Sequence, residues 1–60
     1  MGEIAVGDRC LIRMGHLDDL LEIKVIEISP SGLSFKLEDL NLGTVAWLNC
    51  AKFSIVEILP

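Results

Sequence analysis

Runs of apolar and β-branched residues, separated by short polar turns, divide the chain into segments of strand length. The runs cover residues 9–13, 20–28, 33–40, 44–49 and 54–59. Residues that favour turns separate them at 7–8, 15–19, 29–32 and 41–43. Short strands with regularly spaced turns are typical of a small sandwich or barrel. We therefore predict an all-β fold of five strands.

The period of the apolar positions adds detail to two of these segments. In "LSFKLED" apolar and polar residues alternate, which places Leu33, Phe35 and Leu37 on one face. In "LEIKVIEI" the alternation holds up to Val25 and then shifts by one residue. Such a shift predicts a β-bulge or a sharp bend within a long strand.

Two further segments are less regular. "CAKF" at 50–53 lacks strand alternation, and we predict a single helical turn there. The segment 17–22 could form a short helix. The density of Ile and Val from Ile23 onward and the stop at Pro30 favour a strand instead.

The composition bounds the size and the surface of the fold. Sixty residues are expected to form a single domain, 1–60, with a small core. Hydrophobic residues make up 52% of the chain, which is more than a core of this size can hold. We therefore expect part of the apolar surface to be exposed and to serve a protein–protein contact, with self-association as the simplest case.

The charge argues against nucleic acid and membrane partners. The formal net charge is −4, and the five basic residues are scattered singly, whereas a phosphate-backbone binder needs clustered Lys and Arg. A local basic stripe stays open, because Arg9, Arg13 and Lys24 could share a face. No apolar run reaches the ~18 residues that span a membrane, and "MGEIAV" lacks the features of a signal peptide. We expect a cytoplasmic protein.

A resemblance to a known family supports the fold. The chain contains "VGDRCLIR" and then "EIKVIEISPSGLSFKLEDLNLGTVAWLNCAKFSIVEILP". Over residues 6–59 this order resembles Src-homology-3-like small barrels, including Tudor-like members and short uncharacterised bacterial and phage proteins. The resemblance implies a five-stranded small barrel with a long bent second strand and a helical turn before the last strand. It implies little about function, because such barrels carry many unrelated activities.

The segment "TVAWLN" contains the only tryptophan. The resemblance implies that Leu48 points inward with Ala46, and that Trp47 and Val45 point outward on a ligand face. Alternation alone requires only that Trp47 and Leu48 face opposite ways, so the reverse arrangement, with Trp47 in the core, stays open. We expect the two phenylalanines, Phe35 and Phe53, in the core. Too few aromatic residues then remain for a proline-binding groove or a methyl-lysine cage.

The residues that could carry chemistry do not form a recognisable set. We interpret "HLDD" at 16–19 as a solvated loop and the two cysteines, Cys10 and Cys50, as buried thiols without a disulfide. A zinc site would need His16 and both cysteines to converge. The pair Glu38-Asp39 would need a concave pocket to act in catalysis. We predict no metal, no cofactor and no enzymatic activity.

Two functional hypotheses follow. The first is a non-enzymatic protein-interaction or self-assembly module that uses an apolar surface including Trp47 and Val45. The alternative is a nucleic-acid-associated barrel with phosphate contacts from scattered basic residues, namely Arg9, Arg13, Lys24 and Lys36.

Overall fold

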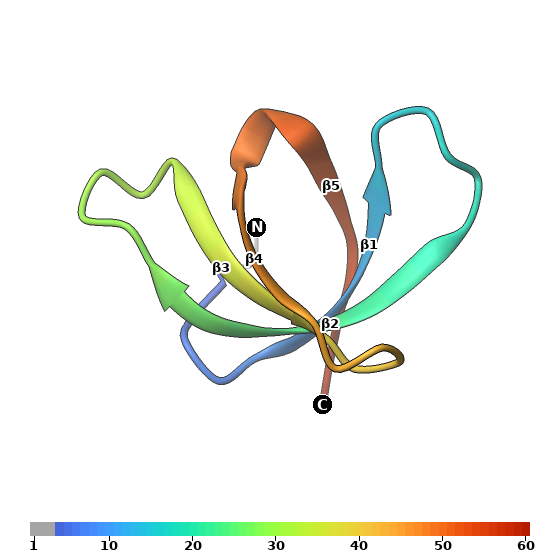
Figure 1. Ribbon diagram of the computed structural model, residues 1–60, viewed down its shortest axis with the longest axis horizontal. Helices are drawn as coiled ribbons and strands as arrows, with labels where there is room; N and C mark the ends of the chain where they lie inside the picture. Colours follow the sequence, from blue (N-terminus) through green and yellow to red (C-terminus); the bar gives the residue numbers. More distant parts are fainter. Residues whose placement is uncertain (1–3) are drawn as a thin grey trace.

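Residues 4–60, described by a computed structural model, form five antiparallel strands in one sheet (Figure 1). The strands are β1 (Arg9–Met14), β2 (Leu20–Ile28), β3 (Ser34–Asp39), β4 (Val45–Asn49) and β5 (Phe53–Leu59). A single 3-10 turn, η1 (Cys50–Lys52), joins β4 to β5. The all-β prediction, the five strands and the helical turn are confirmed. The first half of "MGEIAV", residues 1–3, lies outside the described residues.

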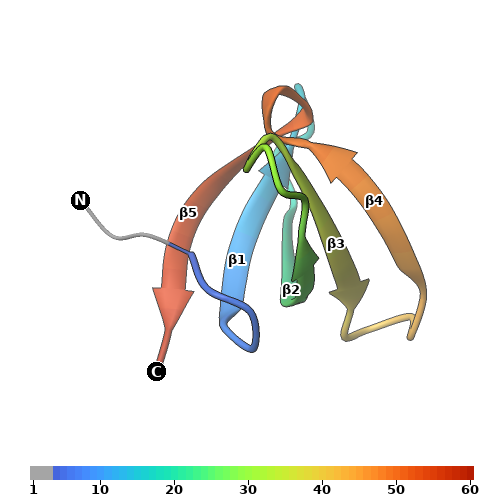
Figure 2. The same ribbon diagram turned by 90° about the vertical axis from the view of Figure 1, so that its left-hand side faces the viewer.

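The strand order in the sheet is β4-β3-β2-β1-β5. The first four strands follow one another as neighbours, and the chain then returns through η1 so that β5 pairs with β1. Figure 2 shows the strands in this order across the curved sheet, from β5 at one side to β4 at the other. Among residues 4–60 the strand pairing ends at β4 on one side and at β5 on the other. The predicted closure into a barrel is therefore not shown.

A bulge bends β2 where the apolar pattern changes phase. Val25 lies opposite Leu37, and Glu27 lies opposite the next residue of β3, Lys36. Ile26 is thus an extra residue between them, as the shift in the pattern predicted. The short helix considered at 17–22 does not form, because β2 begins at Leu20 and residues 17–19 are irregular.

The core lies on one face of this curved sheet. Its six buried side chains are Cys10, Ile12, Ile23, Val25, Leu37 and Phe53, and no polar side chain among the described residues is buried with them. Phe35 packs edge-to-face on Phe53 with a ring-centroid distance of 5.8 Å, in the geometry that aromatic quadrupoles favour. The prediction that both phenylalanines belong to the core is confirmed.

Local hydrogen bonds close the two hairpins that flank β3. Gly32 donates its N–H to the carbonyl of Ser29 at 2.9 Å, and its φ of 76° suits glycine. In the next hairpin Asp39 accepts hydrogen bonds from the backbone N–H groups of Asn41 and Leu42 through Oδ1. The carboxylate of Asp39 therefore holds a turn, which is the common role of Asp at this position.

Candidate functional site

The edge strand β4 presents the two apolar side chains that the sequence placed in a contact surface. The exposed fraction is 48% for Trp47 and 49% for Val45. Leu48 is half-buried and packs against the core, opposite Phe35. The outward orientation of Trp47 is confirmed, and the alternative with Trp47 in the core is wrong. Their role as contact residues stays a prediction.

Ala46 lies on the predicted inward face but is exposed there. It lies opposite the buried Leu37 and so shares the core face with Leu48, but it is exposed. Ala46 belongs to the last strand of the sheet, which has no neighbour among the described residues on its outer side. The sequence could predict the face of Ala46 but not its exposure, because exposure depends on how far the sheet closes.

Among residues 4–60 the backbone of β4 has no partner along one edge. The hydrogen bonds at the two ends of the strand show which residues form that edge. Asp39 donates to the carbonyl of Thr44, and Cys50 donates to the carbonyl of Leu33, each at 2.8 Å. Antiparallel strands direct the backbone groups of alternate residues to the same neighbour. The even positions of β4 therefore face β3, and the backbone N–H and C=O groups of Val45, Trp47 and Asn49 point to the open edge.

Trp47 and Val45 therefore expose two kinds of group, apolar side chains and unpaired backbone N–H and C=O groups. Their side chains form an apolar surface on the outer face, and their backbone groups form a hydrogen-bonding edge beside it. The second feature was not predicted from the sequence. The segment "VAWLN" does carry a signal for it, because it has no charge and no proline, and these are the usual means of protecting an edge.

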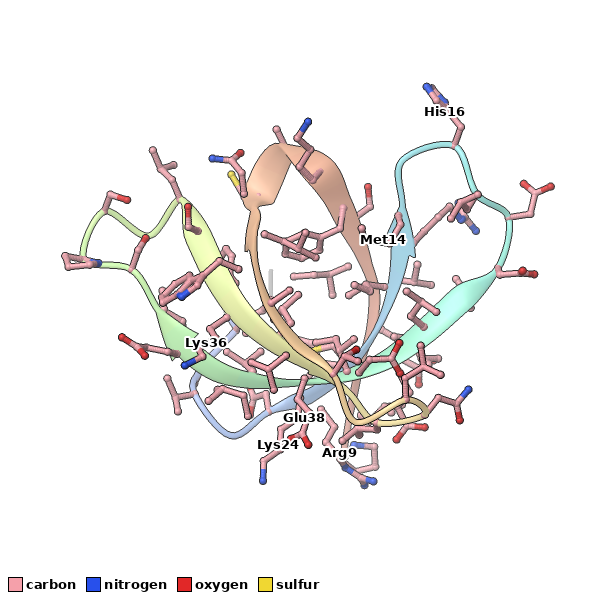
Figure 3. The ribbon with its side chains drawn as sticks, viewed as in Figure 1. Arg9, Met14, His16, Lys24, Lys36 and Glu38 are labelled. Carbon is pink, nitrogen blue, oxygen red and sulfur yellow. The ribbon has the colours of Figure 1, made fainter. Side chains whose placement is uncertain are left out.

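Charged residues of alternating sign surround this surface on the outer face. Lys36 lies opposite Trp47 on one side and Glu27 on the other, and Glu38 lies opposite Val45 and Lys24. Figure 3 shows Glu38 with Lys24 and Arg9 at one end of the sheet and Lys36 farther along it. Starting from β4, the row that begins at Trp47 therefore runs from a positive to a negative charge. The row that begins at Val45 runs from a negative to a positive charge.

The basic residues of the nucleic-acid hypothesis lie on this same outer face. Arg9 lies opposite Lys24, and alternation places Arg13 and Lys36 on the same side. Acidic residues separate them, however, and Arg9 forms an ion pair with Glu22, with Nη1 and Oε2 3.5 Å apart. The face is a mixture of charges rather than the continuous basic stripe that phosphate binding needs.

The two cysteines have different environments. Cys10 is fully buried, and its burial, together with the negative charge of Asp8, raises the pKa of its thiol. Cys50 is exposed in η1, and both thiols are free. The prediction of a buried Cys50 is wrong, because the 3-10 turn carries this residue out of the sheet and away from the core.

The remaining candidates for chemistry stay apart. His16, Asp18 and Asp19 are exposed in the loop between β1 and β2, and Figure 3 shows His16 pointing away from the sheet. Among residues 4–60 no group of three metal-ligating side chains forms, and no pocket is found there. The described residues contain no helix long and apolar enough to cross a membrane.

The second edge of the sheet, β5, also exposes apolar side chains that the sequence analysis did not single out. Ile55 and Ile58 lie opposite the buried Ile12 and Cys10, on the core face, yet their exposed fractions are 42% and 37%. Val56 is the extra residue of a bulge in the pairing with β1.

Comparisons with known proteins give no family: no family model, no curated protein and no solved structure matches the chain.

Proposed function

We propose that this chain is a non-enzymatic module that binds protein, and in the first place a second copy of itself, through the outer surface formed by Trp47 and Val45. The observation that carries the proposal is the half-exposure of both side chains on an edge strand. Water is an unfavourable environment for a large aromatic side chain, and Trp is among the residues most enriched where proteins bind each other.

The overall distribution of apolar residues supports a role in association. Among residues 4–60 twelve large hydrophobic side chains are exposed, against six buried hydrophobic residues. Five of the twelve lie in β4 and β5, the two strands without a second neighbour in the sheet. Exposed apolar side chains beside an open strand edge are available for contact with a partner.

We also infer that the sheet belongs to the Src-homology-3-like class of small barrels. The inference is supported by the return of β5 to pair with β1, by the bulge in β2 and by the 3-10 turn between the last two strands. The bend in the second strand and the helical turn before the last strand are features that the sequence resemblance implied. Among residues 4–60, β4 and β5 are the strands whose outer edges are open to a partner.

The first test is the molar mass in solution, measured by light scattering over a concentration series. We expect a reversible dimer or higher oligomer for the natural chain. Trp47→Ser should shift the equilibrium to the monomer. Leu17→Ser removes a similarly apolar and exposed side chain from the loop between β1 and β2 and should leave the mass unchanged. A natural chain that stays monomeric at every concentration contradicts self-association.

A further inference from the structure

We propose that a second copy of this chain pairs with the free edge of β4, antiparallel and centred on Ala46, so that the two sheets become one continuous sheet. The inference rests on the proposed function and specifies its partner, its contact edge and its register. Three properties of β4 support it: the direction of its backbone groups, the side chains on its outer face and the size of its central residue.

The backbone of β4 can bond a second strand in this register. A twofold axis at Ala46 places Val45 of each copy opposite Trp47 of the other. Both residues direct their N–H and C=O groups away from β3, so each opposed pair can exchange two hydrogen bonds. Strand addition of this kind satisfies the open edge and is a common mode of recognition between sheets and extended segments.

The side chains of the outer face suit this register. With Ala46 at the centre, Trp47 packs on Val45 of the second copy, an aromatic pair with a β-branched residue that stabilises adjacent strands. The row across the interface then runs from Lys36 through this pair to Glu38 of the second copy, with unlike charges at its two ends. With Trp47 at the centre, Trp47 would instead lie directly opposite Trp47 of the second copy, and the row would end at Lys36 on both sides.

The core face also permits the contact. Ala46 would lie opposite Ala46 of the second copy, in a pair without mutual backbone hydrogen bonds, where the two Cα atoms approach to about 4.5 Å. A methyl side chain fits this close approach. Ala46 is exposed, so no rearrangement of the core is needed to admit the second strand.

The other edge is a poorer candidate for the same contact. β5 has a bulge at Val56 and a charge, Glu57, within the strand. Both features are means by which edge strands avoid pairing. β4 has neither, and this difference assigns the contact to β4.

A disulfide tests the register. Ala46→Cys is made together with Cys50→Ser, so that the buried Cys10 is the only other thiol, and the protein is oxidised with diamide. We expect a covalent dimer, because a Cα separation near 4.5 Å suits a disulfide. The matched control is Thr44→Cys in the same background, exposed on the same face. In this register the two thiols introduced at position 44 lie about 14 Å apart, and we expect no covalent dimer.

Amide hydrogen exchange of the natural chain tests the same register without a substitution. In the dimer the N–H groups of Val45 and Trp47 should exchange roughly tenfold more slowly, or slower still, than at a concentration where the chain is monomeric. The N–H groups of Ala46 and Leu48, bonded to β3, should be protected at both concentrations.

The outcomes separate the two proposals. A monomer at all concentrations overturns both. A dimer in which Val45 and Trp47 exchange rapidly, and in which the Ala46→Cys variant does not cross-link, keeps self-association and overturns the β4 contact. Equal cross-linking of the Thr44→Cys and Ala46→Cys variants indicates random collision and also overturns the register.

Discussion

The two edge strands of the sheet, β4 and β5, solve the same physical problem differently. Each has one side without a neighbour, and each exposes large apolar side chains. β5 combines them with a bulge and with Glu57, whereas β4 has a regular register and no charged residue. An open edge without such protection is prone to pair with another strand. This difference supports the proposal that β4, rather than β5, forms the contact with a second copy.

The largest expected effect is a loss of stability on truncation of a core residue, compared with the loss on truncation of its neighbour in the edge strand β5. Ile12 and Ile55 lie directly opposite each other on the core face, but Ile12 is 1% exposed and Ile55 is 42% exposed. Ile12→Ala should lower the free energy of unfolding by about 3 kcal/mol, because it leaves a cavity. Ile55→Ala should lower it by about 1 kcal/mol, because much of the side chain is already in water. Chemical denaturation measures both, and equal losses would mean that β5 is covered.

The next largest effect is a weaker dimer when a backbone N–H group on the free edge of β4 is removed. Val45→Pro removes an N–H group that points away from β3, so the pairing of β3 with β4 should survive. Each dimer loses two hydrogen bonds of about 1 kcal/mol each, which corresponds to a roughly thirtyfold rise in the dissociation constant. Val45→Ala keeps the N–H group and serves as the control for the lost side chain. Light scattering should show a clearly weaker dimer for the proline variant than for the alanine variant.

A third substitution reverses the difference between the edges. Glu57→Val removes the only charge of β5 and leaves Ile55, Val56 and Ile58 in an uninterrupted apolar strand. We expect this variant to form species larger than the natural oligomer, because both edges of each sheet can then pair. Glu38→Gln, which removes a charge from an inner strand, should not have this effect. If Glu57→Val keeps the natural mass, the bulge at Val56 alone protects the edge.

The sequence predicted the strands well because their signals are local. Alternation, turn residues and the phase shift after Val25 lie within a few positions of one another, and the strand bounds agree with the structure to within one residue at each end. The outward orientation of Trp47 came from the resemblance to small barrels, because alternation required only that Trp47 and Leu48 face opposite ways. The exposure of Cys50 was predicted wrongly, and that of Ala46 was not predicted. Both depend on which strand is an edge and on how far the sheet closes, and these are properties of the whole fold.

The smallest expected effect is a difference in reactivity between the thiol of Cys50, which follows β4, and the thiol of Cys10 in the core. Cys50 is exposed, whereas Cys10 is buried and its pKa is raised above the ordinary value of 9.0 by burial and by Asp8. A maleimide reagent at neutral pH should therefore label one thiol per folded chain, and Cys50→Ser should abolish that labelling.

The raised pKa means that the folded state retains the proton of Cys10 to a higher pH than the unfolded state does. The contribution of the Cys10 thiol to the free energy of unfolding is therefore fully present below pH 9.0. It is lost as the pH rises through the pKa of the folded state. Cys10→Ala should remove this part of the alkaline destabilisation, and labelling of both thiols in the natural chain at neutral pH would show that the sheet opens around Cys10.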